Sequence, residues 1–158
     1  MVPVARGNRA VDGPIFLFGG SEFEDFLGCL NCFRTEPFSV WNESAEYGDP
    51  TNPISIWNTS GVYGALDSDE SPWNPHAKSP PVAVDRVGNL YGYFTRNANI
   101  PQRVRPSPGH PYWSHFDLLV SLLENYDWVI AHLEEMRAEY DGRPWVDPDR
   151  PDVPGNDE

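Results

Sequence analysis

The sequence has few basic residues and no long apolar run. Its 158 residues include 11 Lys and Arg against 24 Asp and Glu, which gives a net charge of −13. Affinity for phosphates comes largely from Lys and Arg, so this balance argues against nucleic acid and against an anionic membrane surface as partners. No stretch approaches the ~18 consecutive apolar residues of a membrane span. The charge instead suits a protein that binds a basic partner or a divalent cation.

Several signals of known chemistry and of export are also missing. The sequence contains no Gly-rich phosphate loop, no Gly-x-Ser-x-Gly and no His-Glu-x-x-His. Residues 1–9 lack the apolar run of a signal peptide, so we expect a cytoplasmic protein. A processed secreted chain with an added Met1 would look the same.

Cysteine is scarce, and both cysteines belong to one motif, Cys29-Leu30-Asn31-Cys32. Three interpretations stay open: a structural pair (buried thiols or a short-range disulfide), half of a zinc site, or a redox pair. Zinc would need two more ligands, for which His76 is the leading candidate and His110, His115, His132 or a carboxylate are the others. A thioredoxin-like site would need a βαβ unit, which the sequence does not indicate.

Three copies of one motif follow at a spacing of 16 residues. They are Ser39-Val40-Trp41-Asn42, Ser55-Ile56-Trp57-Asn58 and Ser71-Pro72-Trp73-Asn74, and the first two continue to Tyr47-Gly48 and Tyr63-Gly64. Such an internal repeat indicates a duplicated structural unit. Because only two and a half copies are present, the repeat region, 33–80, must pack against other elements.

The aromatic residues of the repeat allow two interpretations. Trp provides a large apolar body with an indole N–H, and Asn closes turns through side-chain hydrogen bonds. The glycine after each Tyr tolerates a positive φ. The residues concerned are Trp41, Trp57, Trp73, Tyr47 and Tyr63. They form either part of the core, which the usual burial of Trp favours, or an exposed platform for a protein or other ligand.

A calcium site between repeats is a further hypothesis. The run Asp67-Ser68-Asp69-Glu70 begins like a calcium loop, although the Gly and the distal Glu of an EF-hand are missing. Asp49 occupies the equivalent loop one repeat earlier. The candidate ligands are therefore Asp49, Asp67, Asp69 and Glu70, and the possible cofactors of the chain are zinc, calcium or none.

Two pairs of short apolar runs predict two β-hairpins. The first pair is 14–20 with 26–30, and the second is 82–85 with 90–95, joined by a turn at 86–89. Gly28 and Gly92 stand at matching places inside the returning strands, where an interior glycine often marks a bulge. We expect the two hairpins to form one antiparallel sheet of about four strands.

A single long amphipathic helix is predicted over 112–142. Ser114 and Asp117 resemble a capping box, and apolar residues recur at helical spacing from Phe116 to Tyr140. The expected organisation is a flexible leader at 1–13, one globular domain at 14–142, and an acidic, Pro-rich, disordered tail at 143–158. The fold class is then α+β, with aromatic repeat loops beside the sheet and the helix.

The order of these motifs resembles an uncharacterised bacterial domain. The resemblance rests on the Cys-Leu-Asn-Cys motif, the tandem Ser-Ile-Trp-Asn and Tyr-Gly units, and the hairpin that follows Pro80-Pro81, and it covers about residues 15–96. It implies no established activity, so no catalytic residue is carried over from it.

These features predict a non-catalytic structural or interaction module. It would bind a protein or other ligand through an aromatic and acidic surface, because aromatic residues are favoured anchors in interfaces. A basic protein is one candidate partner, since the predicted helix is strongly acidic. The alternative is a metal- or thiol-dependent enzyme centred on Cys29 and Cys32.

Overall fold

The computed structural model describes residues 13–141. Its elements are, in chain order, β1 (Ile15–Gly19), β2 (Asp25–Cys29), β3 (Val82–Asp85), β4 (Leu90–Tyr93), α2 (Trp113–Glu124), α3 (Tyr126–Ala131) and α4 (Leu133–Glu139). Within this range no helix is both long and apolar enough to cross a membrane. Nearly all of the predicted leader and the whole predicted tail lie outside the described residues.

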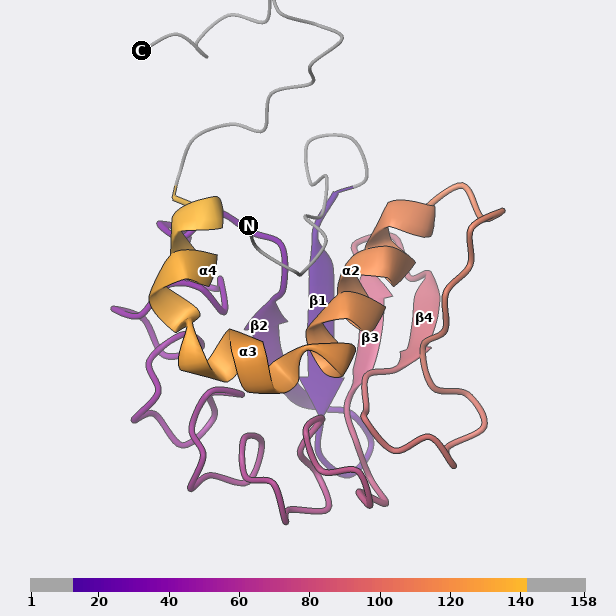
Figure 1. Ribbon diagram of the computed structural model, residues 1–158, viewed down its shortest axis with the longest axis horizontal. Coiled ribbons are helices and arrows are strands. Elements are labelled where there is room, and N and C mark those ends of the chain that lie inside the picture. Colours follow the sequence, from indigo (N-terminus) through magenta and orange to yellow (C-terminus); the bar gives the residue numbers. More distant parts are fainter. Residues whose placement is uncertain (1–12, 142–158) are drawn as a thin grey trace, which may run out of the picture.

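The four strands form one antiparallel sheet in the order β2-β1-β3-β4. This confirms the expected sheet of two hairpins, which meet through β1 and β3. The repeat region is the excursion between the hairpins, and it begins at the border of β2, where Ser39 forms a parallel bridge with Cys29. In Figure 1 the helices lie in front of the sheet and the repeat region lies below and beside it.

Gly28 and Gly92 make the two hairpins alike. Each has a positive φ, 112° and 124°, and each pair of strands has a register shift beside its glycine. Only glycine adopts such a φ without strain. A Cβ at position 92 would also lie 2.6 Å from the carbonyl oxygen of Gln102. The predicted bulges are therefore present, and they allow a later segment to approach each returning strand.

The prediction of one long C-terminal helix was wrong, because the segment forms three short helices. The breaks fall at Asn125 and His132, whose φ and ψ leave the helical range. At the first break the Asn125 amide donates to the Ser121 carbonyl, and at the second the His132 ring lies 2.7 Å from the Trp128 carbonyl. Such side-chain contacts with the preceding turn compete with the backbone ladder. The first helix begins after Tyr112 without a side-chain cap, so Ser114 does not form the expected capping box.

The repeat region is a coil of successive turns rather than strands. Backbone N–H groups donate to carbonyls three residues earlier at matching places in each copy, for example Ser55 to Asn52 and Ser71 to Ser68. The Asn of each motif adds two bonds: its amide donates to a carbonyl six residues earlier, and its oxygen accepts from the N–H two residues later. The third copy keeps both of these hydrogen bonds, so its Asn closes a turn of the coil as in the first two copies.

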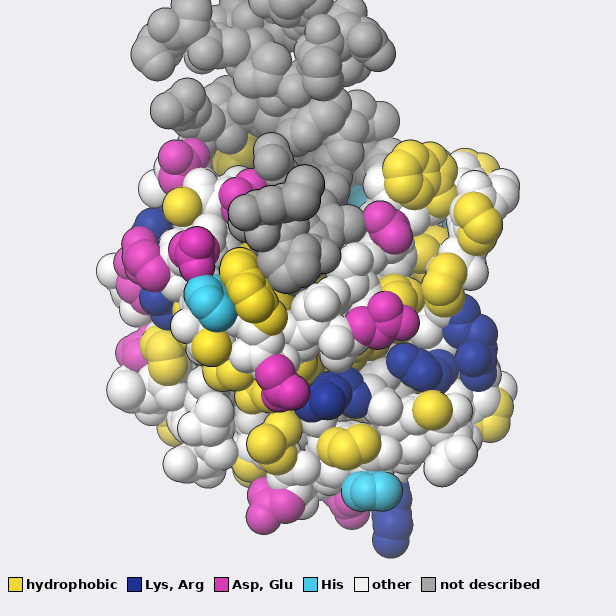
Figure 2. All heavy atoms as spheres, viewed as in Figure 1, with side chains coloured by type: hydrophobic (Ala, Val, Ile, Leu, Met, Phe, Trp, Pro, Cys, Tyr) yellow, Lys and Arg dark blue, Asp and Glu magenta, His cyan; other side chains and the backbone are white. Residues whose placement is uncertain are grey.

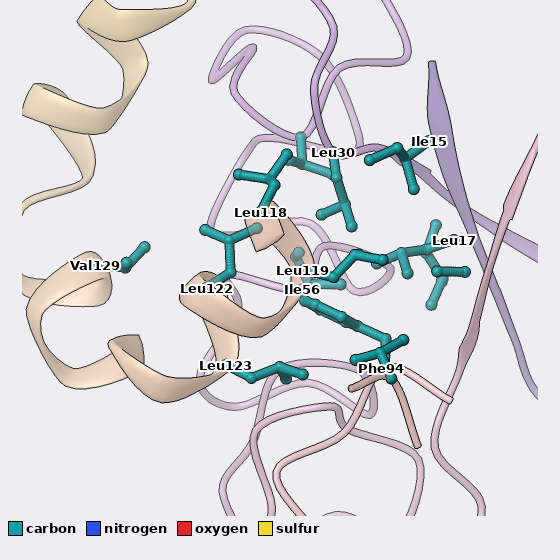
Figure 3. Packing of buried hydrophobic residues seen from close by; sticks show 14 of the residues in the cluster. Ile15, Leu17, Leu30, Ile56, Phe94, Leu118, Leu119, Leu122, Leu123 and Val129 are labelled. Atoms are coloured by element: carbon teal, nitrogen blue, oxygen red, sulfur yellow. The ribbon is translucent and has the colours of Figure 1, made fainter. Parts of the chain in front are cut away.

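One core joins the sheet, the coil and the helices. Leu118, Leu119 and Leu122 of α2 face Leu17 of the sheet and Ile56 of the coil (Figure 3). All five side chains have no exposed surface. Burial of each such side chain contributes about 1.5–3 kcal/mol, so the α2 face is a main source of stability.

Candidate interaction surface

The face of the sheet that points away from the helices is apolar along all four strands. Cross-strand partners share a face of a sheet, so the register places two rows of side chains here. The accessible side chains of the first row, whose β2 member Cys29 is fully buried, are Phe16, Val84 and Leu90, and those of the second row are Phe26, Phe18, Val82 and Tyr93. We call these seven residues the outer face. None of them is charged.

The outer face is separate from the core. Its side chains are half-buried, except for Leu90, which is 64% exposed. On the opposite face Ile15, Leu17 and Ala83 are fully buried in the core cluster. The described helices all lie on that inner side of the sheet (Figure 1). An antiparallel sheet with one solvated face normally alternates apolar and polar residues, and this sheet does not.

Aromatic rings pack together at the β1–β2 side of the outer face. The ring centroid of Phe26 lies 5.7 Å from that of Phe16, 5.3 Å from that of Phe18 and 5.0 Å from that of Tyr47. Phe38, which is 36% exposed, extends the cluster at the β2 border. Edge-on and tilted ring contacts of this kind fix side-chain positions, so the surface is preorganised.

An acidic border follows β2. Glu36 and Glu46 stand close in sequence to Phe38 and Tyr47, and Glu46 is exposed. Burial raises the pKa of the Tyr47 hydroxyl, and the neighbouring Glu46 carboxylate raises that pKa further. The carboxylate therefore lies close enough to the aromatic cluster to act on it electrostatically.

A basic border follows β4. Arg86 lies in the turn before this strand, Arg103 forms a parallel bridge with Tyr93 of the outer face, and Arg105 follows two residues later. Among residues 13–141 none of these three arginines forms an ion pair. The two borders of the outer face thus carry opposite charges.

The three repeat tryptophans lie in the core and not on this surface. Trp41, Trp57 and Trp73 are 0%, 2% and 0% exposed. Their rings form a row with centroid steps of 5.3 and 5.5 Å, and Tyr140 and Tyr126 stack on its two ends at 5.0 and 4.5 Å. The three tryptophans are therefore part of the core, and no exposed indole face is left for a ligand.

The indole N–H groups link each turn of the coil to the chain before it. Each donates at 2.6–2.7 Å to a buried carbonyl: Trp41 to Leu30, Trp57 to Val40, and Trp73 to Ile56. The motif serine fixes the Trp backbone, since its hydroxyl accepts from the Trp N–H. These bonds explain why Ser, Trp and Asn recur together.

The two repeat tyrosines differ in position. Tyr63 is 6% exposed, and its hydroxyl donates to the Asp25 carboxylate at 2.5 Å. Burial, followed by this hydrogen bond and the charge of Asp25, raises the pKa of Tyr63 well above its usual value. Tyr47 is half-buried and contacts Phe26. Of the five aromatic candidates, Tyr47 alone borders the outer face.

Cys29 and Cys32 form a disulfide and have no exposed surface. A disulfide offers no thiolate to a metal, and His76 is exposed. In the described part of the chain no group of three or more His, Cys, Asp or Glu side chains could hold a metal ion. Disulfides are rare in cytosolic proteins, so the bond favours an oxidising compartment over the expected cytoplasm. The location itself stays a prediction.

The calcium candidates do not form such a group either, as the same search of residues 13–141 applies to them. Asp49 instead accepts from the N–H and the hydroxyl of Thr51 at 2.9 and 2.8 Å. These hydrogen bonds lower the pKa of its carboxyl. Asp49 therefore closes a local turn of the coil.

A buried polar chain connects β3, β4 and α2. The Tyr91 hydroxyl lies 2.8 Å from Nδ1 of His115 and 3.2 Å from the Asp85 carboxylate. Burial alone would raise the pKa of Asp85, but the hydrogen bonds that it accepts from Asn89 and its other neighbours hold that pKa below its usual value. His115 has no exposed surface. These hydrogen bonds therefore hold β3, β4 and α2 together and are not open to a substrate.

Acidic side chains gather over α4, on the helix side of the molecule, which faces the viewer in Figures 1 and 2. Arg34 holds part of this group together, because its guanidinium bonds Glu43 of the coil at 2.5 Å and Glu134 of α4 at 3.0 Å. Arg137 pairs with the same two carboxylates. Among the other helix acids, Asp117, Glu124, Asp127 and Glu135 are exposed and Glu139 is half-buried.

Comparison of the chain with protein families, with curated proteins and with solved structures finds no match in any of the three. The resemblance to an uncharacterised bacterial domain therefore stays a prediction.

The outer face was missed by the sequence reasoning, although the signal is present. Residues 15–18 and 82–84 are apolar at every position rather than at alternate positions. Such runs are typical of strands that are apolar on both faces. Neither Phe16 nor Val84 belongs to the repeat.

Proposed function

We propose that this chain is a non-catalytic interaction module whose binding surface is the outer face of its sheet. One observation carries the proposal: the sheet is apolar on both faces, and the described helices cover only one of them. Contiguous exposed apolar patches on a folded protein usually mark an interaction site. The ring cluster around Phe26 supplies the aromatic anchors that such sites favour.

The chemistry of the surface favours a protein as the partner. The two rows consist of Phe, Val, Leu and Tyr, and they are flat because they follow the sheet. A flat apolar surface with a charged border matches the general anatomy of protein interfaces, in which an apolar centre is surrounded by a polar rim. We favour this function over an enzyme centred on Cys29 and Cys32, because neither cysteine has exposed surface that a substrate could reach.

Site-specific photo-crosslinking tests the proposal. The photoreactive residue p-benzoylphenylalanine is placed at Phe38 on the border of the outer face or, as the control, at Val62, which is 51% exposed in the coil. In cells that contain the natural partner, we expect a crosslinked protein adduct from position 38 and none from position 62. Adducts at position 62 alone, or at neither position, would reject the outer face as the binding surface.

A further inference from the structure

We propose that the partner of the outer face is a second copy of this chain, packed sheet to sheet. This inference rests on the proposed function, because it assumes that the outer face binds protein. Two sheets that pack face to face lie about 10 Å apart and interdigitate their inner side chains. The two rows of the outer face present bulky side chains from all four strands for such packing.

The composition of the outer face favours another apolar sheet over an extended peptide. An extended peptide that lies on a sheet face needs hydrogen-bond partners for its own buried backbone N–H and C=O groups. Phe16, Phe18 and Val84 provide no donor or acceptor for that purpose. A second sheet needs none, because its backbone groups already pair within the sheet.

The sheet edges do not favour growth by strand addition. Beside β2, the N–H of Cys29 donates to the Phe38 carbonyl, and beside β4, the N–H of Tyr93 donates to the Gln102 carbonyl. Both edge strands are thus partly covered by a later segment of the same chain. Covering an edge prevents edge-to-edge pairing, which leaves the face as the surface for a second copy.

Charge complementarity sets the orientation of the two copies. A two-fold rotation about an axis along the strands places the β2 border of one copy over the β4 border of the other. Glu46, next to Tyr47 at the β2 end of the second row, would then face Arg103, which bridges Tyr93 at the β4 end of the same row in the partner copy. Rim pairs of this kind contribute little affinity, but they favour one orientation over the alternatives.

The net charge of −13 opposes self-association only weakly in this arrangement. Seven acids, on α2, α3, α4 and just after α4, lie on the inner side of the sheet and so away from the interface: Asp117, Glu124, Asp127, Glu134, Glu135, Glu139 and Asp141. Exposed charges separated by more than the Debye length, about 8 Å at physiological salt, are largely screened. Added salt should therefore strengthen or preserve a self-complex, whereas it would weaken a complex with a basic protein.

Sedimentation velocity on the purified full chain tests the inference. We expect a monomer–dimer equilibrium with a Kd in the micromolar range, so that the dimer forms at chain concentrations below roughly 100 μM. The Kd should not rise when NaCl is raised from about 50 to 300 mM. Leu90→Glu would face the acidic border of the partner copy and Phe38→Arg would face its basic border, so each places like charges opposite one another and should raise the Kd at least about tenfold. Val62→Arg, at a comparably exposed site in the coil, should leave the Kd unchanged.

The outcomes separate this inference from the proposed function. A monomer at every concentration, or a dimer that Leu90→Glu and Phe38→Arg leave intact, would overturn self-association. If the chain is monomeric but position 38 crosslinks a different protein, the outer face is still a binding surface and only the identity of the partner is wrong. If neither association nor crosslinking occurs, both proposals fail.

Discussion

Each residue of the repeat motif has a defined task in the coil. The serine hydroxyl fixes the Trp backbone, the indole N–H binds the preceding part of the chain, and the Asn side chain closes the next turn. A buried N–H without a partner costs about 1–3 kcal/mol. The pairing of Trp57 with the Val40 carbonyl therefore adds to the larger contribution from the burial of its ring.

The Tyr-Gly unit requires glycine because another part of the backbone passes close to it, and not because the residue has a positive φ. Neither Gly48 nor Gly64 has a positive φ, which corrects the expectation from the sequence. A Cβ at either position would lie 2.1 Å from the carbonyl oxygen of the motif asparagine, Asn42 or Asn58. The backbone of one coil turn thus passes directly over the Asn backbone, where any side chain would collide.

A substitution at Gly64 tests this explanation. Gly64→Ala should lower the free energy of unfolding by about 1–3 kcal/mol, because the new methyl group must displace backbone. Gly109→Ala is the control, since a Cβ there would have no atom within 4 Å. Urea unfolding of both variants measures the difference. Equal stability of the two variants would show that the coil turns are not in close contact at Gly64.

At the level of elements, the sequence predicted the hairpins better than the helix. Gly28 and Gly92, together with the apolar runs around them, are local signals, and they located both bulges correctly. Helical periodicity correctly placed helix over 113–139 but could not show the breaks at Asn125 and His132. Those breaks lie where Asn125 and His132 contact carbonyls of the preceding turn, and the apolar periodicity carries no signal of such contacts.

The contact between the coil and α4 depends on an ion cluster. Arg34 bonds both Glu43 and Glu134, and its backbone N–H donates to the Tyr140 carbonyl. The hydrogen bond from Arg34 is the main cause that lowers the pKa of Glu43 from 4.5 to about 2. The charged form of Glu43 therefore stabilises the fold.

The pH dependence of stability tests this cluster. The folded pKa of Glu43 lies below its unfolded pKa, so its contribution is complete above about pH 4.5 and is lost as the pH falls toward 2. Glu43→Gln removes the titrating group. The difference in unfolding free energy between the natural chain and this variant should thus shrink steadily over that range. A difference that stays constant between pH 5 and pH 2 would contradict the pairing.

At the scale of the whole molecule, the apolar side chains divide into two unequal sets. The larger set fills the space between the inner face of the sheet, the coil and the helices (Figure 3). The smaller set is the outer face, where Phe18 and its neighbours stay half-buried. The sequence predicted the first set through the tryptophan repeat. The second set is signalled by apolar residues at every position of 15–18 and 82–84, but the strand register is needed to place Phe16 and Val84 on one face.

The disulfide fits this division of the molecule. Cys29 is the last residue of β2, and Cys32 lies just before the repeat region. The disulfide therefore links the sheet to the first repeat. The Cys32 carbonyl also accepts from the Ser39 hydroxyl of that repeat. The pair therefore has a structural position at the junction of two parts of the core.

Hydroxyl-radical footprinting, read residue by residue by mass spectrometry, tests the binding role of the outer face most directly. In dilute solution we expect oxidation of Phe18, Tyr93 and the exposed Trp113, while Trp57 stays protected by burial. As the concentration of the chain, or of a partner identified by photo-crosslinking, rises, the oxidation rates of Phe18 and Tyr93 should fall. The oxidation rate of Trp113 should not change. Unchanged rates at Phe18 and Tyr93 under all conditions would contradict the assignment of the outer face as a binding surface.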